Sequence, residues 1–311
     1  MGVMTRERFQ NLLEPYVWKV YTQTMNQEGD IIPQLYDVNT STKAFEKFTG
    51  IGSLGLMKKW NGTVYYDDVR ALWDKTYIHQ KYSMGIMIER DLWDDAQYSE
   101  VKDRVNQVML SIFRTRQIHA TIPFEKAFVT SFTDDEGDTI STAGPDGVAL
   151  CAVNHPTFPG ASAAGDLQSN LGSSALSLDA LETTKLAMKE FKDDRGKKLL
   201  IVPDTVIIPP NLEYQFDEMM KSEGRYDTAN RVDNVRRGAY KKIVLDFLTD
   251  TNAWFMVDSK LMKQYLKWFE RRKPTPERDE DFDTEVLKWK FISRYSFGFH
   301  GWHFVYGNNP G

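Results

Sequence analysis

The chain has 311 residues, 41% of them hydrophobic, and a formal net charge of -5 at pH 7, which is typical of an ordinary folded protein of one or two domains. The single cysteine excludes a disulfide framework and a multi-cysteine zinc site. The acidic balance argues against a protein that grips nucleic-acid phosphates tightly. No apolar run is long enough for a membrane span, and the first residues lack the apolar stretch of a secretory signal. The sequence therefore predicts a protein made in the cytosol, without a membrane partner.

A polar, aromatic arm is expected over residues 1–49. Apolar residues between positions 12 and 20 recur at helical spacing, and Pro15 is compatible with a first helical turn. An arm with an apolar stripe but little bulk must bury that stripe on its own body or on a neighbouring chain. We therefore single out Tyr16 and Trp18 as candidate interface residues.

Residues 50–96 have strand character and predict a long, exposed, two-stranded excursion. One strand is expected over residues 63–66, after the turn signal Asn61-Gly62, and alternation continues over residues 77–88. Aromatic side chains that a loop cannot bury itself suit contacts with another chain. The candidate anchors on a neighbour are Trp60, Tyr65, Tyr66 and Trp73. Glu89 and Arg90, which follow, are expected to set register more than affinity.

Residues 50–55 match the glycine pattern of dinucleotide-binding loops. That function needs a buried strand before the glycines and a helix directly after them. The preceding residues 43–49 are too charged for a central parallel strand, and Asn61-Gly62 breaks any helix that follows. The sequence favours a flexible hinge here, with no cofactor.

The strongest helical pattern covers residues 97–119, with apolar residues on one face, charged residues on the other, and Pro123 expected to end the helix. Residues 134–176 are rich in turn residues and predict loops. Residues 177–260 predict a compact α/β unit whose first helix is capped by Ser177 and whose second starts at Pro210. Its expected strands are residues 199–202, 205–208, 242–248 and 253–257. An acidic linker over residues 274–285 then leads into a strongly β-patterned tail.

Sites for chemistry are few. The acidic run 134–138 could hold a cation but lacks the distal glutamate of a calcium loop, so a solvated acidic loop is favoured. Cys151 and His155 could pair as nucleophile and base, but no third group or oxyanion hole is marked, so a small core residue is favoured for Cys151. We expect no catalytic, cofactor or metal site, and hence a binding or structural protein rather than an enzyme.

A series of segments, in this order, resembles the Mu-like major head subunit family of tailed phages. The segments are Trp60-Asn-Gly62, residues 77–82, Ile88-Glu-Arg-Asp91, Asp146-Gly-Val-Ala-Leu150, Asn154-His-Pro156, Asp193-Asp-Arg-Gly196, Ile207-Ile-Pro-Pro-Asn-Leu-Glu213, Ala253-Trp-Phe255 and Trp302-His-Phe-Val-Tyr-Gly307. No single segment is diagnostic, but their order and spacing are together specific. The resemblance covers residues 50–307.

The resemblance implies an α+β chain with the Hong Kong 97-like capsid fold. That fold has an N-terminal arm, an extended E-loop, a peripheral (P) domain made of a long spine helix and a β-sheet, and an axial (A) domain of α/β type. The implied divisions are 1–49 for the arm, 50–88 for the E-loop, 89–139 for the P-domain with spine helix 97–119, 140–260 for the A-domain, and 261–311 for a linker and strands that return to the P-domain.

The resemblance also implies the function of a major capsid protein. Such a chain would assemble with itself as hexamers and pentamers into the icosahedral head of a tailed double-stranded DNA phage, after synthesis in the host cytoplasm. Implied partners are a portal, decoration proteins and non-specifically contacted DNA, together with a separate scaffold protein or none. The alternatives are an encapsulin-like shell of the same fold, because fold does not fix contents, and an enzyme that uses residues 134–138 or the Cys151 region.

Overall fold

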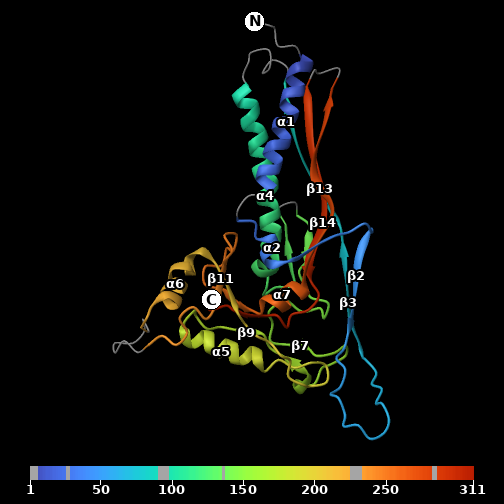
Figure 1. Ribbon diagram of the computed structural model, residues 1–311, viewed down its shortest axis with the longest axis vertical. Coiled ribbons are helices and arrows are strands. Elements are labelled where there is room, and N and C mark those ends of the chain that lie inside the picture. The colour runs from blue at the N-terminus through green and yellow to red at the C-terminus, as the bar shows by residue number, and fades with distance from the viewer. Residues whose placement is uncertain (1–5, 26–28, 90–97, 135–136, 225–232, 282–285) are drawn as a thin grey trace.

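In the computed structural model the protein is elongated, with α1 near one end and a projecting loop at the opposite end (Figure 1). The structure describes residues 6–25, 29–89, 98–134, 137–224, 233–281 and 286–311, apart from the side chains of residues 6–14, 98 and 280. Among these residues, no helix combines the length and the apolar character that a membrane span requires.

Two long helices and a long β-hairpin make up one half of the molecule (Figure 1). Helix α1 (Arg6–Met25) packs along α4 (Tyr98–Glu125), and α4 packs on a sheet of strand order β1-β13-β14-β4. The strands are β1 (Asp37–Thr40), β4 (Gln80–Ile88), β13 (Leu266–Glu280) and β14 (Leu287–Phe299). Their shared core comprises Val17, Val20, Ile88, Val101, Val105, Val108, Met109, Leu287, Trp289 and Phe291. The apolar stripe that predicted α4 is therefore its buried face.

The two prolines do not mark helix ends, which corrects both expectations. Helix α1 begins at Arg6, so Pro15 lies in its interior rather than in its first turn. Helix α4 runs through Pro123 to Glu125 instead of ending before it. Pro123 removes only its own hydrogen bond, because the chain after it still bonds, with the Lys126 amide donating to the Ile122 carbonyl 2.9 Å away.

The expected acidic linker is largely a strand, and this prediction is wrong over residues 274–280. Those residues complete β13 and pair antiparallel with β14 up to Glu280 opposite Leu287. Two register shifts lie between Glu270 and Thr275, and the second admits Pro274, whereas Pro276 pairs in register opposite Phe291. Cross-strand charges then stabilise the pairing, for Lys290 lies 3.2 Å from Glu277. Residues 282–285 of the expected linker lie outside the described part of the chain.

The second half of the molecule contains a five-stranded sheet of order β11-β10-β12-β15-β9. Its strands are β9 (Leu171–Gly172), β10 (Thr205–Ile208), β11 (Lys241–Val244), β12 (Trp254–Val257) and β15 (Val305–Asn308). The other helices described are α2 (Ile32–Leu35), α5 (Leu178–Lys189), α6 (Glu213–Lys221), which follows the 3-10 turn Pro210–Leu212, and α7 (Ser259–Tyr265). Every residue of β10 and β12 is buried, which makes these strands the centre of the core.

The prediction of a strand over residues 199–202 is wrong. The stretch has no regular secondary structure and no partner strand, and the amide of Val202 instead donates to the Asp258 carboxylate, 2.8 Å away. Leu200 and Val202 point outward, with exposed fractions of 92% and 61%. A short apolar run is consistent with a buried strand, but the run alone does not show that a partner strand lies beside it.

The predicted cap of α5 is confirmed. The Ser177 hydroxyl accepts a hydrogen bond from the Ala180 amide at 3.1 Å. We expect Ser177→Ala to lower the free energy of unfolding by about 1 kcal/mol, because that amide loses its partner. Urea unfolding monitored by circular dichroism measures the loss. Ser173→Ala, at an exposed site outside the helix, is the control, and equal stability of the two variants would contradict the assigned cap.

A hairpin projects from the junction of the two halves (Figure 1). It consists of β2 (Phe45–Ile51) and β3 (Ala71–Ile78), which pair antiparallel and are joined by residues 52–70 without regular structure. The strand expected over residues 63–66 is absent there, because no second strand lies beside it to share hydrogen bonds. Strand β4 follows β3 directly but pairs with β14, so the predicted excursion is divided between two sheets.

The corner between β3 and β4 is fixed by His79. Its ring nitrogens lie 2.9 Å from the Ser296 hydroxyl and 3.1 Å from the Ser41 hydroxyl, and the residue is buried. The short pairs β5 (Ser131–Thr133) with β6 (Thr139–Ser141), and β7 (His155–Pro156) with β8 (Leu167–Gln168), complete the description.

Candidate subunit interface

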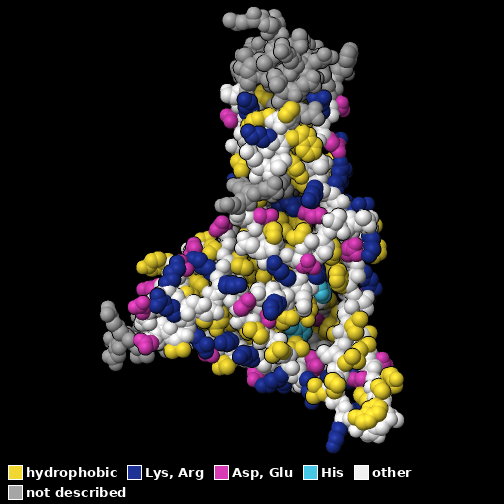
Figure 2. Space-filling model, in the orientation of Figure 1, with side chains coloured by type: hydrophobic (Ala, Val, Ile, Leu, Met, Phe, Trp, Pro, Cys, Tyr) yellow, Lys and Arg dark blue, Asp and Glu magenta, His cyan; other side chains and the backbone are white. Residues whose placement is uncertain are grey.

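The loop of residues 52–70, called here the projecting loop, carries apolar side chains into solvent. Figure 2 shows hydrophobic side chains gathered over this end of the molecule. The exposed members are Leu54, Leu56, Met57, Trp60, Val64, Tyr65, Tyr66 and Val69. Single exposed apolar residues are ordinary, but a contiguous group of this kind marks an interaction surface.

The expected aromatic anchors differ in their surroundings. Trp60 and Tyr66 are free of the body of the chain, with exposed fractions of 67% and 86%. Tyr65 is 51% exposed and lies under the ammonium of Lys58, whose nitrogen is 3.6 Å from the ring centre. Trp73 lies in β3 and is half-buried. Trp60, Tyr65 and Tyr66 are therefore available to another chain, whereas Trp73 already packs against its own chain.

The other candidate interface residues are also divided. The hydroxyl of Tyr16 donates to the Asn106 side chain at 3.3 Å, so this ring serves the packing of α1 on α4. Trp18 is 42% exposed and makes an edge contact with Tyr21. Glu89 is exposed, and Arg90 lies outside the described residues.

Aliphatic side chains that the sequence analysis does not single out also belong to this surface. Leu56 and Met57, with exposed fractions of 71% and 100%, extend the surface formed by the aromatic rings. The signal was present as an apolar run between two turn segments with no periodicity that would bury it.

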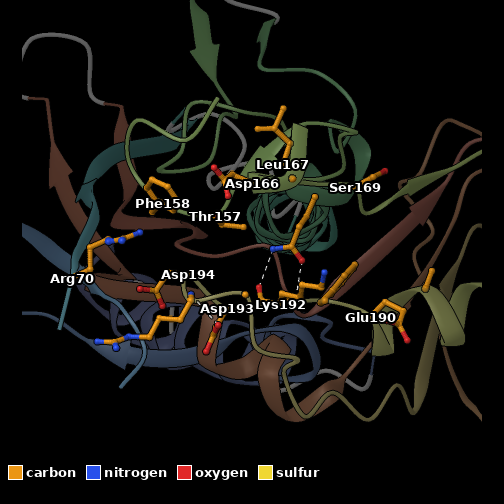
Figure 3. A pocket seen from close by; sticks show the side chains of 16 residues that line it. Arg70, Thr157, Phe158, Asp166, Leu167, Ser169, Glu190, Lys192, Asp193 and Asp194 are labelled. Atoms are coloured by element: carbon orange, nitrogen blue, oxygen red, sulfur yellow. Dashed lines mark hydrogen bonds between the residues drawn. The ribbon is translucent and has the colours of Figure 1, made fainter. Parts of the chain in front are cut away.

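The base of the projecting loop borders a polar pocket of about 460 Å³. Figure 3 shows Arg70 and Phe158 on one side of the pocket, with Asp193 and Asp194 on another. The Arg70 guanidinium lies 4.2 Å from the centre of the Phe158 ring. The Gln168 amide spans the backbone of Lys192, accepting from its nitrogen at 2.7 Å and donating to its carbonyl at 2.9 Å. The pocket is therefore the seam where the loop meets the turn that follows α5.

Cys151 and His155 are not a catalytic pair. Cys151 is buried, and burial raises the pKa of its thiol well above the ordinary value, so a thiolate is disfavoured. His155 is buried too, with Nδ1 2.7 Å from the Asp146 carboxylate and its ring stacked on Trp302. The small-core reading of Cys151 is confirmed. The Asp146–His155 pair was not predicted, although both residues lie in segments that the sequence singled out.

The described residues contain no group of three side chains arranged to hold a metal ion. In the acidic run 134–138, which lies between β5 and β6 in the sequence, the Asp138 amide donates to the Asp134 carboxylate at 2.7 Å. Residues 135 and 136 of that run lie outside the described part.

Comparison with known proteins identifies a family model that matches most of the chain. No curated protein matches it. The model of a family described as phage capsid protein matches residues 74–307.

Three solved structures share the fold at low sequence identity. The procapsid protein of bacteriophage JBD30 is 12% identical, with a TM-score of 0.52 over 98% of this chain and 76% of that one. The capsid protein of an empty GTA particle is 12% identical, with a TM-score of 0.53 over 90% and 89%. A chain from a structure described as Mycobacterium phage Patience is 9% identical, with a TM-score of 0.54 over 99% of this chain and 91% of that one. The α+β fold is therefore the Hong Kong 97-like fold that these capsid proteins share, and the chain belongs to the phage capsid protein family.

Proposed function

We propose that the chain assembles as hexamers and pentamers into the icosahedral head of a tailed phage and encloses a double-stranded DNA genome. The observation that carries the proposal is the projecting loop, which exposes apolar residues that its own chain does not cover. The same loop repeated on identical copies gives a head-to-tail contact, and such contacts close into rings. The same chain must then form both pentamers and hexamers, so part of that contact must accommodate two angles between neighbouring subunits.

The division of the chain into capsid domains is also a proposal. Residues 1–49 act as the N-terminal arm, and α4 is the spine helix of the P-domain, whose sheet is β1-β13-β14-β4. The five-stranded sheet with α5 and α6 acts as the A-domain. The pairing of β4 with β14 supports an E-loop that ends with β3 at Ile78 rather than at residue 88.

We assign Trp60, Tyr65 and Tyr66 as anchors that lie across a neighbouring subunit. Each ring buries about 150–250 Å² when fully covered. Trp73 would hold the root of the loop, Glu89 with Arg90 would set register, and Trp18 with Tyr16 would serve the arm. The exposure of the first three rings supports this division of roles.

Further partners are proposed on chemical grounds. Net charge of -5 suits a shell wall that contacts packaged DNA non-specifically and holds few phosphates. A scaffold protein, a portal and decoration proteins are the other expected partners, and the fold is shared with a JBD30 capsid described as decorated with minor capsid protein trimers. Synthesis in the host cytoplasm precedes assembly into the virion, and the role of the chain is structural rather than catalytic.

Trp60→Ala tests the proposed contact. We expect it to lower the assembled fraction at least tenfold at fixed protein concentration, because loss of a central interface tryptophan costs about 2 kcal/mol or more. Thermal stability should stay unchanged, since the ring touches solvent in the single chain. Negative-stain electron microscopy with light scattering measures the assembled fraction.

The matched control is Thr63→Ala, an exposed position in the same loop. Shells formed by Trp60→Ala as well as by the wild type would contradict the anchor assignment. A wild-type chain that stays monomeric at high concentration, with its scaffold present, would contradict the proposed function itself.

A further inference from the structure

We propose that the turn of residues 193–196 is a clasp that sets the direction in which the projecting loop leaves the body. Asp194 and Arg195 are then positioning residues for assembly. The inference rests on the proposed function, because it assigns a cause to the direction of the loop that contacts the neighbour. It also explains two sequence patterns that the capsid role leaves without a task, the glycines of residues 50–55 and the turn at 193–196.

The clasp holds both branches of the loop at once. On the outgoing branch, the Ser53 amide donates to Asp194 Oδ1 at 2.7 Å, and Arg195 Nε donates to the Ser53 carbonyl at 2.8 Å. On the returning branch, the same guanidinium donates to the Asp68 carbonyl and lies 3.0 Å from the Asp67 carboxylate. One arginine therefore joins the two branches, and its fork of donors suits that geometry.

The glycines let the branches approach the clasp. A Cβ on Gly52 would lie 2.5 Å from Asp194 Oδ2 and 3.0 Å from the Arg70 carbonyl oxygen. A Cβ on Gly55 would lie 2.8 Å from Asp67 Oδ2, the atom that already accepts from the Gly55 amide at 2.6 Å. The glycines expected to form a flexible hinge therefore also permit close packing against the clasp.

The turn of residues 193–196 is stabilised by hydrogen bonds of its own, independent of the loop. The Asp193 carboxylate accepts from the amides of Arg195, at 2.9 Å, and Lys197, at 2.7 Å. Gly196 has a φ of +74°, which a side chain would strain. Figure 3 shows Asp193 and Asp194 facing the pocket beside the loop base. The clasp is therefore a preformed element of the body.

The bonds to the clasp divide the loop into a held neck and a free tip. They reach Ser53 and Asp68 in the neck, where Gly52 is buried and Ser53, Gly55 and Asp67 are half-buried, whereas every residue from 56 to 66 is exposed. The adaptation that two ring sizes require is then confined to the tip. The neck keeps a constant direction relative to the five-stranded sheet, so the anchors reach the same neighbour each time.

Hydrogen exchange on the unassembled, full-length chain tests the clasp. In Arg195→Ala we expect the amides of Ser53 and Gly55 to exchange about tenfold faster, because local opening loses the bonds that hold the neck. Lys197→Ala, at the exposed residue directly after the turn, is the control and should leave exchange unchanged. Arg195→Lys keeps the charge near Asp67 but not the forked donors, so it should fall between the two. Asp194→Asn, which keeps an acceptor for the Ser53 amide, should stay near wild type, and Asp194→Ala should not.

Assembly gives the second readout. We expect Arg195→Ala to form open sheets or shells of mixed size under conditions where Lys197→Ala forms uniform shells. Unchanged exchange in Arg195→Ala would overturn the clasp. Faster exchange with shells of wild-type yield and size would overturn its positioning role. If the wild-type chain forms no shells, the proposed function fails, while the exchange comparison still decides whether the clasp holds the loop.

Discussion

The free energy of unfolding of the single chain should fall steeply as the pH drops from about 6.5 towards 4. Three histidines are held neutral in aromatic surroundings. Burial lowers the pKa of His119, His300 and His303 from 6.5 to about 4, and the positive charges of Arg116 and Lys267 add to the effect on His119 and His300 respectively. Their rings stack or pack on Phe297, Phe48 and Trp302. Burial also lowers the pKa of His79.

The free energy of unfolding falls with pH because the unfolded state takes up protons that the folded state does not. An unfolded histidine is protonated below about pH 6.5, whereas these folded rings resist protonation until about pH 4. Their stabilising contribution is therefore complete above pH 6.5 and is lost as the pH falls through 4. Each ring contributes a slope of up to about 1.4 kcal/mol per pH unit in that window. Carboxylates with lowered pKa values, such as Asp37 and Asp67, act at lower pH.

Urea unfolding at a series of pH values measures the effect. The wild-type slope should correspond to an uptake of up to three protons on unfolding near pH 5. His119→Gln, which keeps a polar partner for the Tyr295 hydroxyl 2.7 Å away, should reduce that uptake by about one. A stability that stays constant between pH 7 and pH 5, or an unchanged slope in the variant, would refute the explanation.

Arg116→Met should cost about 3–5 kcal/mol, since it leaves a buried carboxylate without its cation. Arg116 of α4 contacts Glu270 of β13, and their side chains are only 11% and 6% exposed. Glu270 also accepts from Trp268 Nε1 at 2.8 Å, and the Trp268 ring stacks on Tyr295. This ion pair ties the long helix to the long hairpin inside an aromatic layer.

A second substitution separates the charge from the packing. Arg116→Met combined with Glu270→Gln removes both charges and keeps an acceptor for Trp268, so most of the lost stability should return. Denaturant unfolding of the two single variants and the double variant gives the coupling energy. Additive losses would show that the two side chains do not stabilise each other. Lys102→Met, on the same helix at an exposed position, controls for the change in helix charge.

Periodic patterns carried most of the fold prediction. The stripe of α4, the alternation of β14 and the cap of α5 each depend on neighbours in the sequence, and each is confirmed. The failures share a cause. Whether residues 274–280 or 199–202 become a strand depends on a partner that is distant in the sequence, which a local pattern does not reveal.

Part of the candidate interface could be predicted in the same way. Trp60 and Tyr66 stood out because large rings in a polar, turn-rich stretch lack a local core. The clasp could not be predicted, because Ser53 and Asp194 are separated by 141 positions and meet only in the folded chain. The glycine pattern of residues 50–55 is typical of a backbone that packs closely against another segment, but it does not identify that segment.

The order of strands has a consequence for synthesis. Strand β1 needs β13 beside it, β4 needs β14, and β9 needs β15, with Asp37 opposite Lys267 as one instance. Neither sheet is complete until residues 266–308 have left the ribosome. Such distant pairings make folding slow, and they leave a nascent chain with exposed strand edges. A partly made subunit therefore lacks both completed sheets, and the body from which the projecting loop leaves is finished only after translation has passed β15.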